Sequence, residues 1–191
     1  MERNAGAFLF YAKAFCRRGS SLCMKLITTL FTLFSLAFLV KADPLPVGSP
    51  APDITALDQN GAPVVLKDVF AKGPTLVYFY PKADTPGCTK QACSIRDDWE
   101  PLKAKGIQVL GVSGDEPASQ KKFEQKYNLP FTLLSDPEGK LAAAFGVPFL
   151  NKISKRMSFL IKDGKVVWNM PAASTAEHSK DVIKAFDALP K

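Results

Sequence analysis

The sequence contains only one histidine, His178, and four cysteines among its 191 residues. Cys16 and Cys23 lie in an N-terminal extension, so the rest of the chain holds only Cys88 and Cys93. A closed set of four Cys and His ligands is therefore not available outside the extension, which argues against a structural zinc site. His178 falls near the start of the last helical pattern, and we expect it to be exposed and without a role.

Most of the chain has no large excess of either basic or acidic residues. Six of its 25 basic residues and one of its 18 acidic residues fall in residues 1–42, which leaves 19 basic and 17 acidic residues in 43–191. The formal net charge of +7 therefore comes mainly from the extension. No basic surface for nucleic acid is indicated.

The extension also lacks an uncharged run of membrane-spanning length. The run over residues 26–40 has 15 residues, whereas a spanning helix needs about 20. Lys25 precedes the run, and Val40-Lys41-Ala42 follows it as a small-residue cleavage site before Asp43. These features are typical of a cleaved signal peptide, and an uncleaved anchor is the alternative.

We accordingly divide the chain into a targeting segment, residues 1–42, and one domain, residues 43–191. Met24 is a second candidate start, because the segment that begins there forms a compact signal peptide by itself. Export, to a bacterial periplasm, is the expected destination, with no membrane association after cleavage. Import into an organelle is the alternative, since Arg- and Ser-rich segments with few acidic residues also suit transit peptides.

Strand and helix patterns alternate along the domain. Residues 54–66 predict a hairpin around Asn60-Gly61, and residues 75–80 predict a buried strand. Further strands are expected at 108–112, 131–134, 157–161 and 165–168, and helices at 88–105, 118–127 and 141–145, followed by a final helix that opens at Ser174 and extends to about Leu189. This order predicts an α/β protein in which helices cover both faces of a central mixed sheet, as in the thioredoxin-like fold.

Two local signals refine the predicted helices. Pro101 lies inside a helical pattern and predicts a break near residues 97–101, because proline removes a backbone hydrogen bond. Ser174 and Glu177 have the spacing of a capping box, which predicts that the last helix begins at this point.

The strongest functional signal follows the buried strand. The loop YPKADTPG, residues 80–87, brings Cys88 to the start of a helix. Unpaired backbone N–H groups and the helix dipole favour a thiolate at such a position. Cys93 follows five residues later. We therefore predict sulfur redox chemistry.

The spacing of Cys88 and Cys93 limits how they can pair. In one regular α-helix, five residues rise by about 7.5 Å and turn by about 140°, which separates the two Cα atoms by about 8–9 Å. A disulfide tolerates at most about 7 Å, so the first turns of the helix would have to unwind. A pair that cycles between thiols and a disulfide is favoured, and a permanent staple in a distorted helix is the alternative.

These residues resemble a known family. Pro81-x-x-x-Thr85-x-x-Cys88 is similar to the active-site signature of peroxiredoxins. The longer run YPKADTPGCTKQACSIRD resembles the bacterioferritin comigratory protein/PrxQ branch, whose members often carry a second cysteine five residues on. The similarity extends over residues 47–191, through SPAPDITALDQNG, VLGVSGD, FTLLSDPEGKLAAAFGV and RMSFLIKDGKV. It implies a thiol-dependent peroxidase without a cofactor, often a monomer.

The resemblance implies a role for each matched residue. Cys88 would attack the hydroperoxide substrate and become a sulfenic acid. Cys93 would condense with it to form a redox disulfide, which a thioredoxin-like reductant would reduce. Thr85 would hydrogen-bond the peroxide and the thiolate, and Pro81 would shape the loop and keep water off the sulfur. Arg156 would stand against the thiolate; it is one of two arginines in the domain, and its planar charged fork suits an anion better than lysine does.

Three other functions stay open at this point. A thioredoxin-type disulfide reductase needs Cys-x-x-Cys, and copper chaperones of a related fold use Cys-x-x-x-Cys, which places both sulfurs on one helix face. The five-residue spacing fits neither, although His178 could serve a metal carrier as a distant ligand. A peroxide sensor would use the same site as the enzyme. Peroxide preference and the electron donor are not readable from the sequence.

Overall fold

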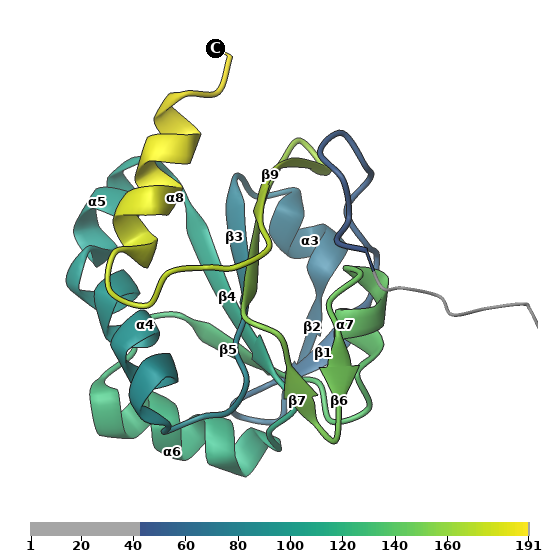
Figure 1. The fold of residues 1–191 in the computed structure, drawn as a ribbon, viewed down its shortest axis with the longest axis vertical. Helices are drawn as coiled ribbons and strands as arrows, with labels where there is room; N and C mark the ends of the chain where they lie inside the picture. The colour runs from purple at the N-terminus through teal and green to yellow at the C-terminus, as the bar shows by residue number, and fades with distance from the viewer. Residues whose placement is uncertain (1–42, 191) are drawn as a thin grey trace, which may run out of the picture. The chain divides into compact units, whose positions relative to one another are not determined.

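A seven-stranded sheet runs through residues 43–190, the part of the chain that the computed structural model describes (Figure 1). The predicted targeting segment, residues 1–42, lies outside the described residues. Across the sheet the strands are β2 (Pro63–Val65), β1 (Thr55–Asp58), β5 (Thr132–Ser135), β4 (Gln108–Ser113), β3 (Thr75–Phe79), β8 (Met157–Lys162) and β9 (Lys165–Met170). β4 pairs in parallel with β3 and β5, and the other neighbours pair antiparallel. The predicted mixed sheet is confirmed.

Helices cover both faces of this sheet (Figure 1). One face carries α4 (Pro86–Asp97), α5 (Trp99–Ala104), α6 (Pro117–Tyr127) and α8 (His178–Asp187). The other carries α3 (Leu66–Phe70) and α7 (Lys140–Ala144). Each layer buries its own apolar cluster against the sheet, so the predicted α/β architecture is confirmed.

Strand β3 shows why both faces need cover. All five of its residues are buried. Leu76 and Tyr78 belong to the cluster beneath α4 and α8, and Val77 and Phe79 to the cluster beneath α3 and α7, because successive strand side chains point to opposite faces. Gly111 of β4 pairs with Tyr78, and a Cβ there would approach the tyrosine to 2.8 Å. Glycine at this position makes room for the buried ring.

The helix break and the two hairpins agree with the sequence-based expectations. α4 ends at Asp97 and α5 begins at Trp99, so the break predicted from Pro101 is confirmed. β1 pairs with β2, and β8 with β9, in the two expected hairpins. α3 and the hairpin of β6 (Phe149–Leu150) and β7 (Ile153–Ser154) were not expected, because elements of two to five residues carry too little periodicity.

The start of the last helix differs from the prediction. α8 begins at His178, and Glu177 caps it without a side-chain hydrogen bond. The Ser174 hydroxyl instead donates to Asp181 Oδ2 at 2.7 Å. The predicted capping box is therefore wrong, because Ser174 is already paired with a side chain on the helix.

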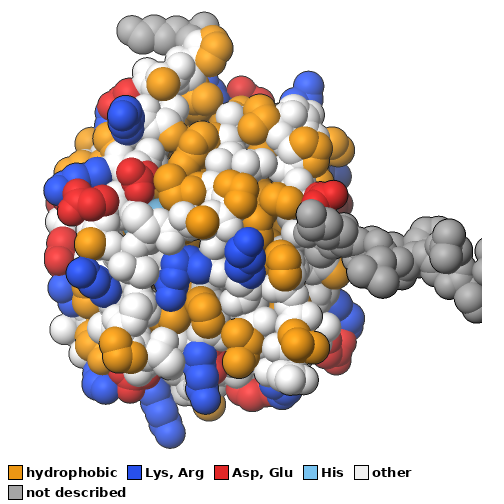
Figure 2. Space-filling view, viewed as in Figure 1, with side chains coloured by type: hydrophobic (Ala, Val, Ile, Leu, Met, Phe, Trp, Pro, Cys, Tyr) orange, Lys and Arg blue, Asp and Glu red, His pale blue; other side chains and the backbone are white. Residues whose placement is uncertain are grey.

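An apolar groove of about 450 Å³ lies between β9 and α8. Figure 2 shows hydrophobic side chains gathered over this part of the surface. Val167, Trp168, Met170 and Leu189 contribute to its lining, and none of the predicted site residues does. Within residues 43–190, no helix combines the length and the apolar character that crossing a bilayer requires.

Candidate active site

The register of β3 and β8 creates the site. The two strands are antiparallel, and Phe79 lies opposite Met157. The chain that leaves β3 therefore lies beside the chain that enters β8. The first leads through residues 81–85 into α4, and the second carries Arg156 immediately before β8. Two segments about 70 residues apart in sequence thus meet at one edge of the sheet.

Cys88 and Arg156 are in direct contact at this edge. Cys88 lies in the first turn of α4, which begins at Pro86, and it is 2% exposed. Arg156 Nη2 donates to Cys88 Sγ at 3.3 Å. A guanidinium is always charged and has donors only, so its placement on the sulfur suits a negative charge there. Proline at the first position of the helix fits because its missing N–H would have no partner in any case.

Cys93 lies on the same unbroken helix and is half-buried. Both thiols are free in the described part of the chain. The geometric premise that the two cysteines share one helix therefore holds. Their pairing as a redox disulfide stays a prediction.

Thr85 and Pro81 belong to the loop between β3 and α4. Thr85 is the residue before the helix, with an extended backbone. Its hydroxyl donates to the Lys82 carbonyl at 2.9 Å, so it closes the loop and keeps its lone pairs as acceptors. Pro81 is half-buried and lies two residues after the end of β3. The structure places both beside the first turn of α4, and their catalytic roles stay predictions.

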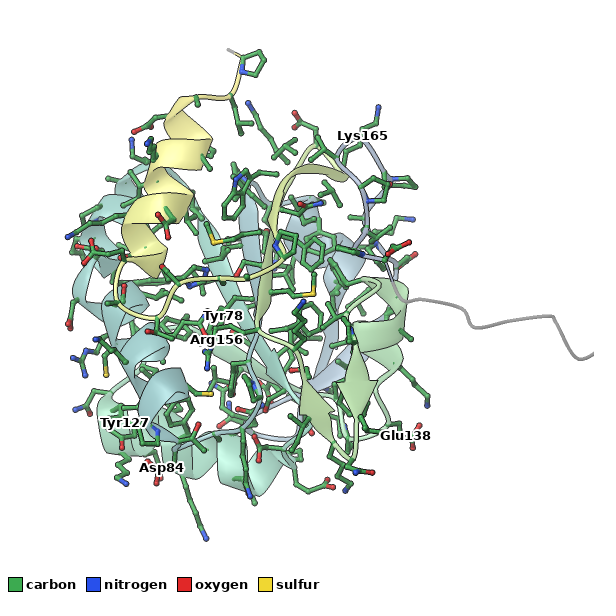
Figure 3. All side chains as sticks on the ribbon, viewed as in Figure 1. Tyr78, Asp84, Tyr127, Glu138, Arg156 and Lys165 are labelled. Atoms are coloured by element: carbon green, nitrogen blue, oxygen red, sulfur yellow. The ribbon has the colours of Figure 1, made fainter. Side chains whose placement is uncertain are left out.

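This loop is held in place by groups on its far side. Asp84 has a left-handed backbone, with φ 58°, and its carboxylate accepts from Lys126 Nζ at 2.7 Å and from the Tyr127 hydroxyl at 2.6 Å. Figure 3 shows Asp84 and Tyr127 close together where the loop meets α6. Lys126 and then Tyr127 hold the pKa of Asp84 below its ordinary value. The Ala83 N–H also donates to Asp115 Oδ2 at 2.7 Å.

Two buried residues extend the site, and sequence reasoning assigned neither of them. Gln91 lies one helical turn after Cys88, and its Oε1 accepts from Arg156 Nη1. Its Nε2 lies 3.2 Å from His178 Nδ1, and His178 Nε2 lies 2.8 Å from Ser158 Oγ. Figure 3 shows Arg156 and Tyr78 near each other in the middle of the molecule.

The expectation that His178 is exposed is wrong. Its side chain is fully buried, because α8 begins at this residue and packs against α4 and β8. The predicted capping box placed the start of the helix at Ser174, so the sequence did not identify His178 as its first residue. A signal for Gln91 was present: it is polar, yet it falls on the buried stripe of α4 together with Cys88, Ala92 and Ile95.

Burial lowers the pKa of His178 to about 4, from an ordinary value of 6.5; Asp181 raises it and Arg156 lowers it. Below pH 6.5 the His178 imidazole therefore binds a proton in the unfolded chain, whereas in the folded protein it stays neutral until the pH approaches 4. The stability carried by the neutral ring is complete above pH 6.5 and is lost as the pH falls toward 4. The loss corresponds to about 3 kcal/mol.

We therefore expect urea unfolding to show a steeper loss of stability between pH 7 and pH 4 in the wild type than in His178→Asn. The asparagine has no titratable group, so the difference between the two curves isolates the histidine from the carboxylates. Parallel curves would contradict the assignment of a buried neutral ring.

These features together define a class of protein. A buried thiol follows a central strand at the first turn of a helix, in a mixed sheet with helices on both faces, and an arginine contacts its sulfur. This is the thioredoxin-like fold, with Cys88 as the candidate functional thiol. The sequence model of the AhpC/TSA family matches residues 47–169, and the chain belongs to that family.

Relatives and solved structures refine this assignment. The chain is 48% identical over 122 residues to the chloroplastic peroxiredoxin Q of Arabidopsis thaliana, and 47% identical over 122 residues to that of Oryza sativa subsp. japonica. Each alignment covers 63% of this chain and 56% of the relative, so the chain spans little more than half of these curated relatives.

The structural neighbours cover more of the chain. Peroxidoxin BcpB from Mycobacterium tuberculosis superimposes with a TM-score of 0.72 at 33% identity, over 77% of this chain and 99% of the neighbour. Peroxiredoxin Q from Xanthomonas campestris gives a TM-score of 0.69 at 28% identity, over 76% and 99%. The resemblance to the PrxQ branch and the thioredoxin-like fold are both confirmed.

The expected localisation is wrong. We expected export to a bacterial periplasm, but the similar curated relatives are chloroplastic proteins of plants. An apolar run after a lysine did not distinguish an export signal from an organelle signal.

Proposed function

We propose that this chain is a thiol-dependent peroxidase that reduces hydrogen peroxide and organic hydroperoxides. The observation that carries the proposal is the contact between Arg156 Nη2 and Cys88 Sγ at the first turn of α4. Membership of the AhpC/TSA family supports it, as do the peroxiredoxin Q relatives. The Xanthomonas campestris bacterioferritin comigratory protein, 27% identical, has alkyl peroxide reduction activity, which supports organic substrates.

The first step is a nucleophilic displacement on oxygen. The Cys88 thiolate attacks the terminal oxygen of ROOH, the O–O bond breaks, and ROH leaves after the departing oxygen takes up a proton. The sulfur is oxidised to a sulfenic acid, and the peroxide is reduced. Arg156 stabilises the charge that passes from sulfur to oxygen, because its Nη2 is already directed at the sulfur. The hydroxyl of Thr85 is free to accept from the peroxide, and Pro81 limits the access of water.

The second step joins the two cysteines. The Cys93 thiol displaces water from the sulfenic acid and gives an intramolecular disulfide, which requires the first turns of α4 to unwind. A thioredoxin-type dithiol then reduces the disulfide by exchange and is itself oxidised. Both cysteines lie on one helix of one chain, so a monomer completes the cycle and no second subunit is needed.

A metal carrier, the alternative function, would need His178 as a third ligand beside the two cysteines, and this residue is already engaged. Both ring nitrogens of His178 are occupied, by Gln91 and by Ser158. A buried ring that is bonded on both sides cannot join the cysteines around a soft metal without breaking these contacts.

The same relatives bear on the compartment in which this chain works. The chloroplastic names of the relatives support import into an organelle as the destination of this chain. Its reductant is then a thioredoxin-type dithiol protein of that organelle.

The proposed cycle predicts how Cys93→Ser behaves. One equivalent of hydrogen peroxide is expected to lower the mass of the wild-type domain by two hydrogens. Cys93→Ser is expected to gain one oxygen instead, to react once per chain and to stop turning over with a thioredoxin-type donor, because the sulfenic acid has no partner thiol. Intact-mass spectrometry and stopped-flow fluorescence measure both outcomes. Sustained turnover of Cys93→Ser with the same donor would remove Cys93 from the mechanism.

A further inference from the structure

The contacts around Gln91 fix the direction of its amide. Arg156 carries hydrogen-bond donors only, so the atom of Gln91 that faces it has to be the carbonyl oxygen. The amide nitrogen is thereby directed at His178 Nδ1, 3.2 Å away. Because this nitrogen is a donor, His178 Nδ1 must act as the acceptor, which requires a ring without a proton on that atom.

The other side of the ring agrees with this assignment. His178 Nε2 then carries the proton and donates to Ser158 Oγ at 2.8 Å. The ring also packs edge-on against Tyr78, with 5.7 Å between the centroids. A neutral ring fits the burial of the side chain, since a charged imidazole without a carboxylate partner is costly in the interior. The contacts thus form an ordered series from Ser158 through His178 and Gln91 to the arginine.

We propose that His178 is a positioning residue for the reacting sulfur: its Nδ1 fixes the Gln91 amide, whose oxygen holds Arg156 on Cys88. The proposal rests on the peroxidase function inferred above and adds to it a group that lies three contacts away from the sulfur. His178 itself touches neither the thiol nor the site of the peroxide.

The physical reason lies in what an unfixed amide would do. Without an acceptor at Nδ1, the Gln91 nitrogen is buried with no partner, which costs about 1–3 kcal/mol. A change of side-chain rotamer that brings this nitrogen to another acceptor or to water relieves the cost, and it takes the amide oxygen off Arg156. The guanidinium then loses its second anchor and moves away from the sulfur.

A second set of contacts separates this role from simple docking of α8. Ser179, the next residue, bonds to Ser94 Oγ at 3.0 Å and donates to Asp98 Oδ2 at 2.6 Å. These bonds also hold the start of α8 on α4, but they do not involve Gln91 or the arginine. Ser179→Ala is therefore the matched control for a purely structural effect.

The test uses two polar substitutions that differ in the ring nitrogen they replace. In His178→Asn the Oδ1 atom takes the position of Nδ1 and can accept from Gln91. In His178→Gln the amide reaches the position of Nε2 and contacts Ser158, which leaves no acceptor for Gln91. Both variants are neutral and hydrophilic, so their folds should be affected similarly.

Two measurements on the full-length protein report the reactivity of the Cys88 sulfur. One is the second-order rate of Cys88 oxidation by hydrogen peroxide, measured by stopped flow. The other is the pH profile of Cys88 alkylation by iodoacetamide in a Cys93→Ser background, followed by mass spectrometry on the peptide that contains Cys88 so that Cys16 and Cys23 do not contribute. This profile reports the contact with the guanidinium without any peroxide. We expect His178→Gln to slow oxidation about tenfold and to move the alkylation profile to higher pH. His178→Asn should stay within about threefold of the wild type, and Ser179→Ala should match it.

A double mutant tests the proposed order of the contacts. If His178 acts through Gln91, His178→Gln combined with Gln91→Leu should be no slower than Gln91→Leu alone. Additive losses would overturn the proposal, as would equal rates for the asparagine and glutamine variants, or a glutamine variant that matches the wild type. A wild-type protein inert to peroxide would instead overturn the peroxidase function, and the alkylation profiles would still test the positioning role.

Discussion

Replacement of Cys88 by serine is expected to lower the rate of peroxide consumption at least about a thousandfold. A serine hydroxyl stays protonated at neutral pH, and an alcohol is a far weaker nucleophile toward peroxide oxygen than a thiolate. Serine is close to cysteine in size and can still accept from Arg156, so the substitution removes the reacting atom and leaves the surroundings in place. The measurement is hydrogen peroxide loss in the presence of a thioredoxin-type donor, over a range of protein concentrations.

The matched comparison for this variant is Cys93→Ser. The two substitutions make the same chemical change on the same helix, but only the first should abolish the reaction with peroxide. Cys88→Ser should also keep its mass when peroxide is added, because neither arginine of the described residues donates a hydrogen bond to Cys93. Rapid oxidation of Cys93 in the Cys88→Ser variant would reverse the assigned roles of the two thiols.

The sequence predicted those parts of the site that depend on local pattern. Strand 75–79 carries a run of buried β-branched and aromatic residues, and its periodicity fixes which face each residue occupies. The loop after it leads directly to Cys88, so the position of the thiol at a helix start follows from adjacent residues. Arg156 could be assigned because it immediately precedes a predicted hairpin and matches a family position.

The parts that were missed depend on contacts between distant segments. Gln91 and His178 are 87 residues apart, and their contact depends on how α8 docks on α4. No local pattern in residues 174–178 encodes that docking; the capping-box spacing even favoured an earlier helix start. A buried neutral histidine cannot be distinguished from an exposed one by sequence when a single histidine stands among polar and small residues. The periplasmic expectation was wrong for a different reason, because an apolar run after a lysine suits an export signal and an organelle signal alike.

The reduced site and the proposed disulfide require different conformations of the first turns of α4. The contacts of Arg156 with Cys88 and Gln91 require the first two turns of the helix to be formed. The proposed bond between Cys88 and Cys93 requires the same turns to open. Each catalytic cycle would then break and remake the contacts of the arginine, so the stability of these turns sets a balance between the attack on peroxide and disulfide formation.

Arg156→Met is expected to slow the oxidation of Cys88 by about a hundredfold to a thousandfold. Methionine has a similar length and no charge, so the variant removes both donors to the site: one to the sulfur and one to Gln91. Loss of a preorganised donor at the centre of charge transfer usually has an effect of this size. Arg156→Lys should recover part of the loss, because lysine restores the charge but cannot contact the sulfur and the amide at once in a fixed planar fork.

Arg96 provides the matched control, because it is the other arginine of residues 43–191 and lies on the same helix as Cys88. It donates to Asp97 and to the Tyr127 carbonyl near the surface and has no hydrogen bond to the Cys88 thiol. Arg96→Met should therefore react with peroxide at the wild-type rate, within about twofold, since exposed ion pairs contribute little. Stopped-flow fluorescence at several peroxide concentrations gives the second-order rate constants of all three variants. If Arg156→Met and Arg96→Met lose activity equally, general loss of charge rather than the contact on the sulfur accounts for the effect, and the assigned role of Arg156 is wrong.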